Sequence, residues 1–180
     1  MKAETRVIGI DDGDTRRRRR VVVGAIFRGG LWLDGIVSSY VDVSTPTLGK
    51  VLGDMVVASK FYKELRFAIL HGTMLRSRQS SVLAEFNNTT EMPTIAILRQ
   101  RYSEMSDCAA GREKSTTRFR LHDLSVLGMG LTKEEAMEIL RITCLRGHIP
   151  EPVRVAGLIA STVNAPKRLN WTRGQLRAGS

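Results

Sequence analysis

The chain has 180 residues, of which 42% are hydrophobic, and its 28 Lys and Arg against 18 Asp and Glu leave a formal net charge of +10. This composition excludes an intrinsically disordered chain and suffices for one domain with a buried core. No window approaches the ~18 apolar residues of a membrane span, and the two cysteines lack the CxxC spacing of a zinc knuckle. We therefore expect a cytoplasmic protein without a membrane segment, whose charge favours nucleic acid or another polyanion as partner.

Three strands are predicted before residue 45. Arg6–Ile10 and Val21–Phe27 are apolar and β-branched, and the DDGD between them contains residues that tolerate the positive φ of a hairpin turn. The alternation in LWLDGIVSSYVDV, which follows RGG at 28–30, predicts a third strand, with Trp32 packed on a face of the sheet. The three strands should form an antiparallel meander.

Helices and strands alternate in the next part of the chain. Thr45 and Pro46 predict the N-cap and the first residue of a helix that runs to about Leu65. RFAILHG then predicts a buried strand, and a helix over residues 81–90 and a strand over 93–98 follow. This alternation predicts parallel strand pairing with right-handed crossovers.

The C-terminal third is predicted to hold one more strand and two helices. TTRFRLHDLSVL at 116–127 favours a single strand, and Thr132 with Glu135 has the spacing of a capping box for a helix that ends at Gly147.

The last predicted helix is IPEPVRVAGLIASTV, and its apolar spacing predicts a buried face. That face comprises Val155, Leu158, Ile159 and Val163. We expect one domain over residues 1–164 and a basic, disordered tail over 165–180, which contains Trp171.

Chain direction brings two potential ligands to one edge of the predicted sheet. The first strand rises to Asp11, the second descends, the third rises, the helix descends and the next strand rises to His71. If the first and fourth strands are neighbours, at a spacing of ~4.8 Å, side chains at their carboxyl ends can converge on one ion or substrate. Asp34 should lie near the opposite edge.

The order of these elements resembles the ribonuclease H-like fold. The segments VIGIDDG, VVVGAIFRGGLWLDGIVSS and GLTKEEAMEILRITCLRGHIPEPVRVAGLIAS are similar to the archaeal endonuclease dU family, which is related to endonuclease V. The resemblance spans Arg6 to about Thr162. It implies an α/β fold whose mixed sheet has three antiparallel strands and then parallel strands with crossover helices, and whose helices cover both faces.

The resemblance also implies a function and a set of site residues. A member of this family is a metal-dependent endonuclease of DNA repair that acts on DNA containing deoxyuridine or another deaminated base, with Mg²⁺ or Mn²⁺ as cofactor. In the larger superfamily, the metal-binding acids come from the ends of the first and fourth strands and from a late helix. Asp11 and Asp12 match the family's DDG and are the implied catalytic residues, and with His71 they are the implied metal ligands.

This sequence departs from the family pattern at His71. Relatives carry an acid there, and the region around Leu83 lacks another acid that they place nearby. An imidazole in place of a carboxylate favours Mn²⁺ or Zn²⁺ over Mg²⁺. Four other acids are candidates for the missing carboxylate: Glu85, Glu134, Glu135 and Glu138.

Arginines lie beside the acid pair and are candidate phosphate contacts. They are Arg16, Arg17, Arg18, Arg19, Arg20 and, at a position shared with the family, Arg28. Three alternatives stay open. The acids can form a hairpin turn beside a solvated charge run. The protein can be a nucleic-acid-binding homologue with an incomplete metal site, or an assembly protein with an acidic partner. The sequence does not indicate an oligomeric state.

Overall fold

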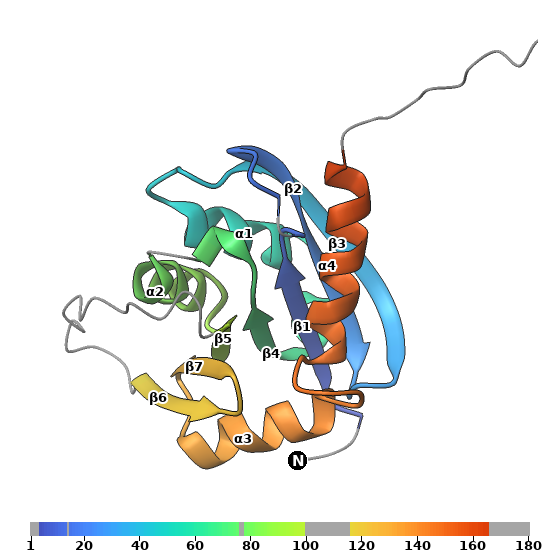
Figure 1. The fold of residues 1–180 in the computed structure, drawn as a ribbon, viewed down its shortest axis with the longest axis vertical. Coiled ribbons are helices and arrows are strands. Elements are labelled where there is room, and N and C mark those ends of the chain that lie inside the picture. Colours follow the sequence, from blue (N-terminus) through green and yellow to red (C-terminus); the bar gives the residue numbers. More distant parts are fainter. Residues whose placement is uncertain (1–3, 14, 76–77, 100–115, 166–180) are drawn as a thin grey trace, which may run out of the picture.

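Seven strands of the described residues form one mixed sheet in the order β3-β2-β1-β4-β5-β7-β6. The computed structural model describes residues 4–13, 15–75, 78–99 and 116–165 (Figure 1). The strands are β1 (Arg6–Asp11), β2 (Arg19–Arg28), β3 (Trp32–Asp42), β4 (Leu65–Leu70), β5 (Thr94–Arg99), β6 (Thr116–Leu121) and β7 (Leu124–Met129). β1 pairs in parallel with β4, and β4 with β5, whereas the other pairs are antiparallel. The predicted meander and parallel crossovers are therefore confirmed.

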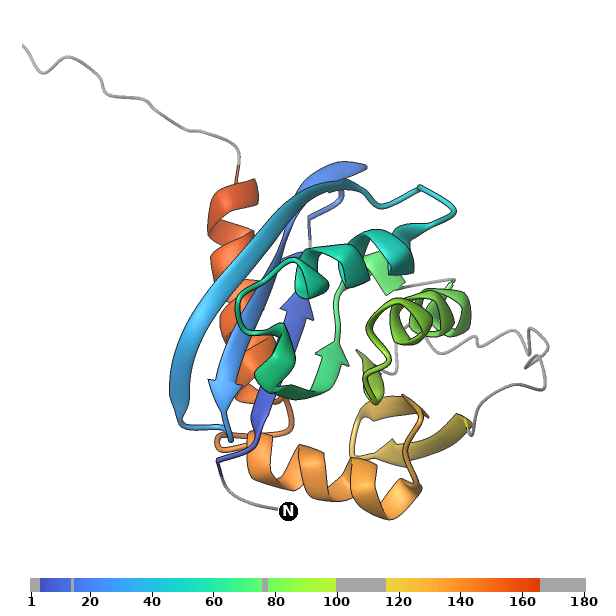
Figure 2. The same ribbon diagram turned by 180° about the vertical axis from the view of Figure 1, so that it is seen from behind.

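Helices cover both faces of the sheet, as the ribonuclease H-like prediction requires. They are α1 (Leu48–Val57), α2 (Gln79–Thr90), α3 (Lys133–Thr143) and α4 (Glu151–Asn164), with 3-10 turns at Tyr62–Glu64 and Thr73–Leu75. α1 and α2 pack on one face, in a core that includes Ile8, Leu52 and Phe86. α3 and the start of α4 pack on the other, where Val7, Ile139 and Val153 share a second core. Figure 1 shows α4 in front of β1 and β2, and Figure 2 shows α1 on the reverse side.

The buried face of α4 differs from the predicted one. Of the four predicted residues, Val155 and Ile159 are partly buried and pack against the core, whereas Leu158 and Val163 are 56% and 55% exposed. The buried residues of this helix include Val153, Ala156 and Ala160 instead. Small side chains let the helix lie close to β1 and β2, so close packing and not apolar size determines which face is buried.

Three predicted boundaries are also wrong. α1 begins at Leu48 and not at Pro46, because residues 42–45 close a turn in which the Thr45 N–H donates to the Asp42 carbonyl, and it ends at Val57. Residues 116–129 form two strands and not one, because His122 takes a left-handed φ of 54° in a hairpin turn. α3 has the predicted capping box at Thr132 but ends at Thr143, before Gly147.

Trp32 does not pack on the sheet as predicted, because its side chain is 69% exposed on the edge strand β3. The predicted basic tail, apart from Ala165, lies outside the described residues. No helix within the described residues is long and apolar enough to cross a membrane.

Candidate functional site

Asp11 and His71 meet at the shared carboxyl edge of β1 and β4. The two strands are neighbours, with Ile10 opposite Leu70, so the residues that follow them lie side by side. The His71 Nδ1 lies 2.6 Å from the Asp11 Oδ2. An ionised carboxylate can only accept, so Nδ1 carries the proton of this hydrogen bond and Nε2 is the other ring nitrogen available to a ligand or substrate. The edge predicted from chain direction is confirmed, and Asp34 lies at the opposite end of the strands, bonded to Arg28.

Asp12 faces away from this pair. Successive side chains of an extended strand point to opposite faces, so Asp11 lies on the α4 face while Asp12 meets Arg20 on the α1 face. The Asp12 Oδ1 accepts from the Thr73 backbone N–H at 2.9 Å, and its Oδ2 accepts from the Thr73 hydroxyl at 2.8 Å. The Arg20 Nη1 also lies 2.8 Å from Oδ2. Both oxygens of Asp12 are therefore engaged by protein groups.

Asp12, Arg20 and Thr73 form a buried polar cluster, in which the Asp12 side chain is 0% and that of Arg20 6% exposed. Burial raises the pKa of Asp12, and the Thr73 hydroxyl and Arg20 oppose that shift. Arg20 also donates to the Thr15 carbonyl and to the Thr73 hydroxyl. The cluster thus ties the β1–β2 connection to the segment that follows β4, and so maintains the edge at which Asp11 and His71 meet.

Two glycines let the backbone approach these carboxylates closely. Gly72 has a φ of +108°, and a Cβ there would lie 2.2 Å from the Asp12 Oδ1, so only glycine fits. Gly157 on α4 faces Asp11, and a Cβ there would lie 3.2 Å from the Asp11 Cγ. The late helix α4 therefore presents a glycine to Asp11.

The arginine run divides into groups with different surroundings. Arg20 is buried with Asp12, whereas Arg18 donates to Asp42 at 3.0 Å and the Arg19 Nε lies 3.7 Å from the same carboxylate. Arg16 and Arg17 are exposed in the β1–β2 connection, at the edge that carries Asp11. Arg28 belongs to the other end of β2, where its partner across the sheet is Arg6. The predicted phosphate contacts therefore do not form one continuous surface.

The other candidate carboxylates are engaged elsewhere. The Glu85 Oε2 accepts from the Gly49 N–H at 3.0 Å, near the start of α1. The Glu135 side chain closes the capping box of α3. Glu134 and Glu138 lie on the same helix, whose C-terminal end approaches Gly30 at the opposite edge of the sheet.

The donors present suit one cation better than two. In the part of the chain that the structure describes, no three His, Cys, Asp or Glu side chains form a group that could hold a metal ion. Asp11 and His71 offer one carboxylate and one imidazole in direct contact. Mg²⁺ and related ions commonly take only one or two protein ligands and complete their shell with water and substrate phosphate. Asp12 as a further ligand stays a prediction.

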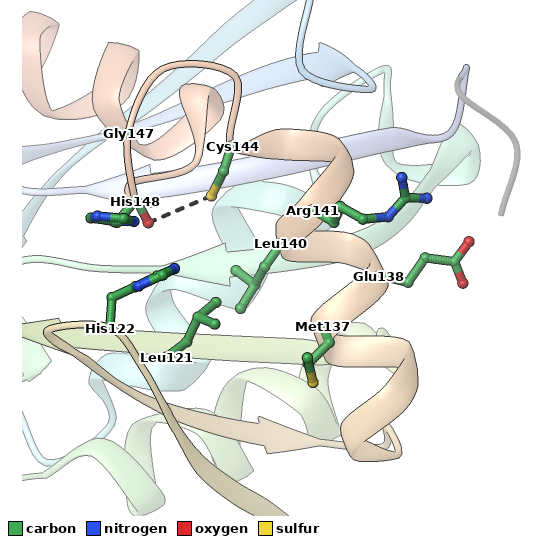
Figure 3. Close-up of a pocket in the computed structure, with 9 residues that line it drawn as sticks. All are labelled: Leu121, His122, Met137, Glu138, Leu140, Arg141, Cys144, Gly147 and His148. Atoms are coloured by element: carbon green, nitrogen blue, oxygen red, sulfur yellow. Dashed lines mark hydrogen bonds between the residues drawn. The ribbon is translucent and has the colours of Figure 1, made fainter.

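A cavity of about 460 Å³ lies between α3 and the β6–β7 turn. Figure 3 shows the residues that line it, among them His122, Met137, Leu140, Cys144 and His148. The two imidazole rings, 26 residues apart in sequence (148 − 122), pack with their centroids 3.9 Å apart. Burial raises the pKa of the Cys144 thiol to about 11, so it is protonated at neutral pH. Sequence reasoning missed this pairing because no local spacing signals a contact between two distant turns.

Comparison with known proteins identifies relatives along most of the chain. A family model described as endonuclease dU matches residues 3–109. A UPF0215 protein of Methanothermobacter thermautotrophicus is 30% identical over 182 residues, which cover 91% of this chain and 89% of the relative. A UPF0215 protein of Methanosarcina acetivorans is 29% identical, with 91% and 92% covered.

Solved structures share the fold. A protein from Archaeoglobus fulgidus superposes with a TM-score of 0.67 at 24% identity, and the match covers 88% of this chain and 97% of that one. Ciona intestinalis endonuclease V, solved with DNA containing an inosine followed by a ribo-adenosine, superposes with a TM-score of 0.58 at 13% identity, with 88% and 84% covered. At these identities the likeness establishes the ribonuclease H-like fold and no more.

Proposed function

Because the chain belongs to the endonuclease dU family, we propose that it is a divalent-cation-dependent endonuclease acting on DNA that contains deoxyuridine or another deaminated base. Family membership supports a nuclease-like reaction. The observation in this chain that carries the proposal is the 2.6 Å contact between Asp11 and His71 at the carboxyl edge of two parallel strands. Ligand-binding side chains of open α/β sheets gather at such an edge.

Asp11 and His71 would hold the cation, through a carboxylate oxygen and a ring nitrogen. A bound divalent cation lowers the pKa of a coordinated water and neutralises charge on the phosphate that is cleaved. The mixed oxygen and nitrogen set suits Mn²⁺ at least as well as Mg²⁺. Without the cation, the Asp11 Oδ2 accepts the Nδ1 proton and thereby fixes the His71 ring and its tautomer. A cation held by both residues would take the place of that proton.

The neighbouring residues would position the site and the substrate. Asp12, Arg20 and Thr73 hold the two segments that carry Asp11 and His71, since the cluster bonds both of them. Arg16 and Arg17 would contact the phosphate backbone, because they are exposed beside the site. Each phosphate contact made by a cation releases about one counterion, so binding should weaken as salt rises.

A second candidate function is nucleic-acid binding without efficient cleavage. It is favoured by the environment of Asp11, which faces Gly157 on the late helix and His71 on the fourth strand, where the superfamily pattern has acids. Loss of two carboxylates removes charge that a pair of Mg²⁺ ions needs.

A cleavage assay separates the two functions. The substrates are end-labelled duplexes of one sequence that contain deoxyuridine, deoxyinosine or neither, incubated with Mg²⁺, Mn²⁺ or a chelator. Asp11→Asn should abolish cation-dependent cleavage, whereas Asp54→Asn, which changes an exposed acid of α1 paired with Lys50, should leave it unchanged. Salt-sensitive binding without cleavage by the wild type would support the second function. Absence of both binding and cleavage at low salt would refute both.

His71 is tested in the same assay. His71→Ala should lower Mn²⁺-dependent cleavage by about 10²-fold or more, the usual effect of losing a group that transfers a proton or holds a ligand. If His71 occupies a weakened ligand position, His71→Asp should raise cleavage with Mg²⁺. A fall with both ions would instead show that the imidazole itself is required.

A further inference from the structure

The edge strand β3 exposes large apolar side chains over most of its length. Leu33, Ile36 and Tyr40 are 48%, 47% and 69% exposed. Their partners on β2 are Phe27, Ala25 and Val21, and these three residues pack against α4. Paired residues point to the same side of a sheet, so Leu33, Ile36 and Tyr40 lie on the α4 face. α4 packs on β1 and β2 and does not cover β3, as Figure 1 shows. Side chains of this kind are normally buried.

The outer backbone edge of β3 is open as well. Among the residues that the structure describes, no strand pairs with it, since β3 ends the sheet. Soluble proteins usually protect such edges with lysine, proline or a bulge. Residues 32–42 contain no lysine or proline. The one irregularity of β3 is the extra residue Asp34, opposite Ile26 and Phe27 of β2, and it leaves Gly35–Asp42 in continuous register.

We propose that a second copy of this chain pairs with β3 in antiparallel fashion, about a two-fold axis at Ser38. In that register Ile36 of each copy lies opposite Tyr40 of the other, on the exposed face. Pairs of aromatic and β-branched side chains are among those that stabilise antiparallel strands. Asp34 would approach Asp42 of the second copy, but each of these acids is already bonded to arginine of its own chain.

The available area agrees with a dimer. Aromatic side chains present ~150–250 Å² each, so Tyr40 at its observed exposure, with Leu33 and Ile36, leaves on the order of 300 Å² of apolar surface per copy. A standard interface buries about 800 Å² per partner. The paired backbone edges and the polar side chains of β3 would supply the remainder.

Salt dependence distinguishes this occupant from a nucleic acid that stacks on Tyr40. Each copy carries a formal charge of +10, so two copies repel one another and added salt screens that repulsion. Self-association should therefore strengthen between 0.1 and 0.5 M NaCl, because the Debye length is about 10 Å at 0.1 M and falls toward 3 Å at 1 M. Binding to nucleic acid would weaken over the same range.

Sedimentation velocity on the full chain tests the proposal. The wild type should sediment as a dimer in 0.5 M NaCl. Ile36→Lys should raise the dissociation constant of the dimer at least tenfold, because each copy would place a lysine opposite Tyr40 of the other. Met137→Lys is the matched control, since Met137 is 44% exposed on α3, away from β3. A monomeric wild type, self-association weakened by salt, or equal loss in both variants would overturn the proposal. Protection of Tyr40 by single-stranded DNA while the protein remains monomeric would also overturn the proposal.

A cross-link gives a test that does not depend on a disruptive substitution. In a background with Cys108 and Cys144 replaced by serine, Ser38→Cys should form a disulfide between copies under mild oxidation. Residues directly opposite in antiparallel strands have Cα atoms ~4.5–5.5 Å apart, within disulfide range. Ser81→Cys, at an exposed position on α2, should stay monomeric. Cross-linking no faster than in that control would refute pairing at Ser38.

Discussion

Asp12→Ala should destabilise the protein far more than the loss of one surface carboxylate would. The substitution removes the 2.8 Å ion pair with Arg20 and the two hydrogen bonds from Thr73. It leaves the Arg20 guanidinium buried, with its side chain 6% exposed. Breaking a buried pair in this way costs about 3–5 kcal/mol, which for a domain of this size lowers Tm by roughly 6–20 °C.

Replacing both Asp12 and Arg20 by apolar residues should recover much of the lost free energy of unfolding. Burial raises the pKa of Asp12, which means that ionising it costs free energy that Arg20 only partly offsets. The double variant Asp12→Leu with Arg20→Met should therefore lose less stability than Asp12→Leu and Arg20→Met lose when each is made alone and the two losses are added, with a coupling energy of about 2–3 kcal/mol.

Urea unfolding followed by circular dichroism measures these free energies. Asp54→Ala provides the control, because the Asp54 side chain is 54% exposed and its pair with Lys50 lies on the surface of α1. That change should cost at most about 1 kcal/mol. A loss below about 1 kcal/mol for Asp12→Ala, or additive losses in the double variant, would refute the role given to the buried cluster.

Three further predictions follow from the local geometry. Gly157→Ala should lower cleavage while leaving the unfolding free energy nearly unchanged, because its Cβ would press on the Asp11 carboxyl at 3.2 Å; unaltered kinetics would contradict this contact. Arg18 and Ser44 hold the pKa of Asp42 well below its usual 3.8, so its stabilising effect is present at neutral pH and lost as the pH falls below that value. Asp42→Asn should accordingly have a lower Tm than the wild type at pH 7, and the difference should shrink as the pH is lowered from about 4 toward 2. Cys144, whose pKa is raised to about 11, should react with iodoacetamide slowly at pH 7 and faster up to pH 11 in a Cys108→Ser background; a rate independent of pH would show that access, not ionisation, limits it.

Local sequence signals were sufficient for the first five strands and for their order along the chain. The β-branched runs around Ile8 and Val23 and the capping box at Thr132 depend on near neighbours, which the sequence displays directly. Chain direction through these elements also placed Asp11 and His71 on one edge, because parallel strands share their carboxyl ends.

Side-chain environment could not be predicted in the same way. The apolar pattern of α4 pointed to Leu158 and Val163 as core, yet the helix buries Ala156 and Ala160, since how closely it approaches the sheet depends on the strands beneath it. The period of two in β1 was a signal that Asp11 and Asp12 diverge, but identifying Arg20 and Thr73 as the partners of Asp12 needed three dimensions.

The sequence by itself determined the family, through the resemblance of three of its segments. It also determined the order of the first elements and the edge at which Asp11 and His71 lie, because these follow from local periodicity and chain direction. Only the tertiary structure decided that Asp12 is tied to Arg20, that α4 presents Gly157 to Asp11, and that β3 leaves Ile36 and Tyr40 exposed. Each of these depends on packing between segments distant in the chain, and such contacts leave no mark on the spacing of residues along it.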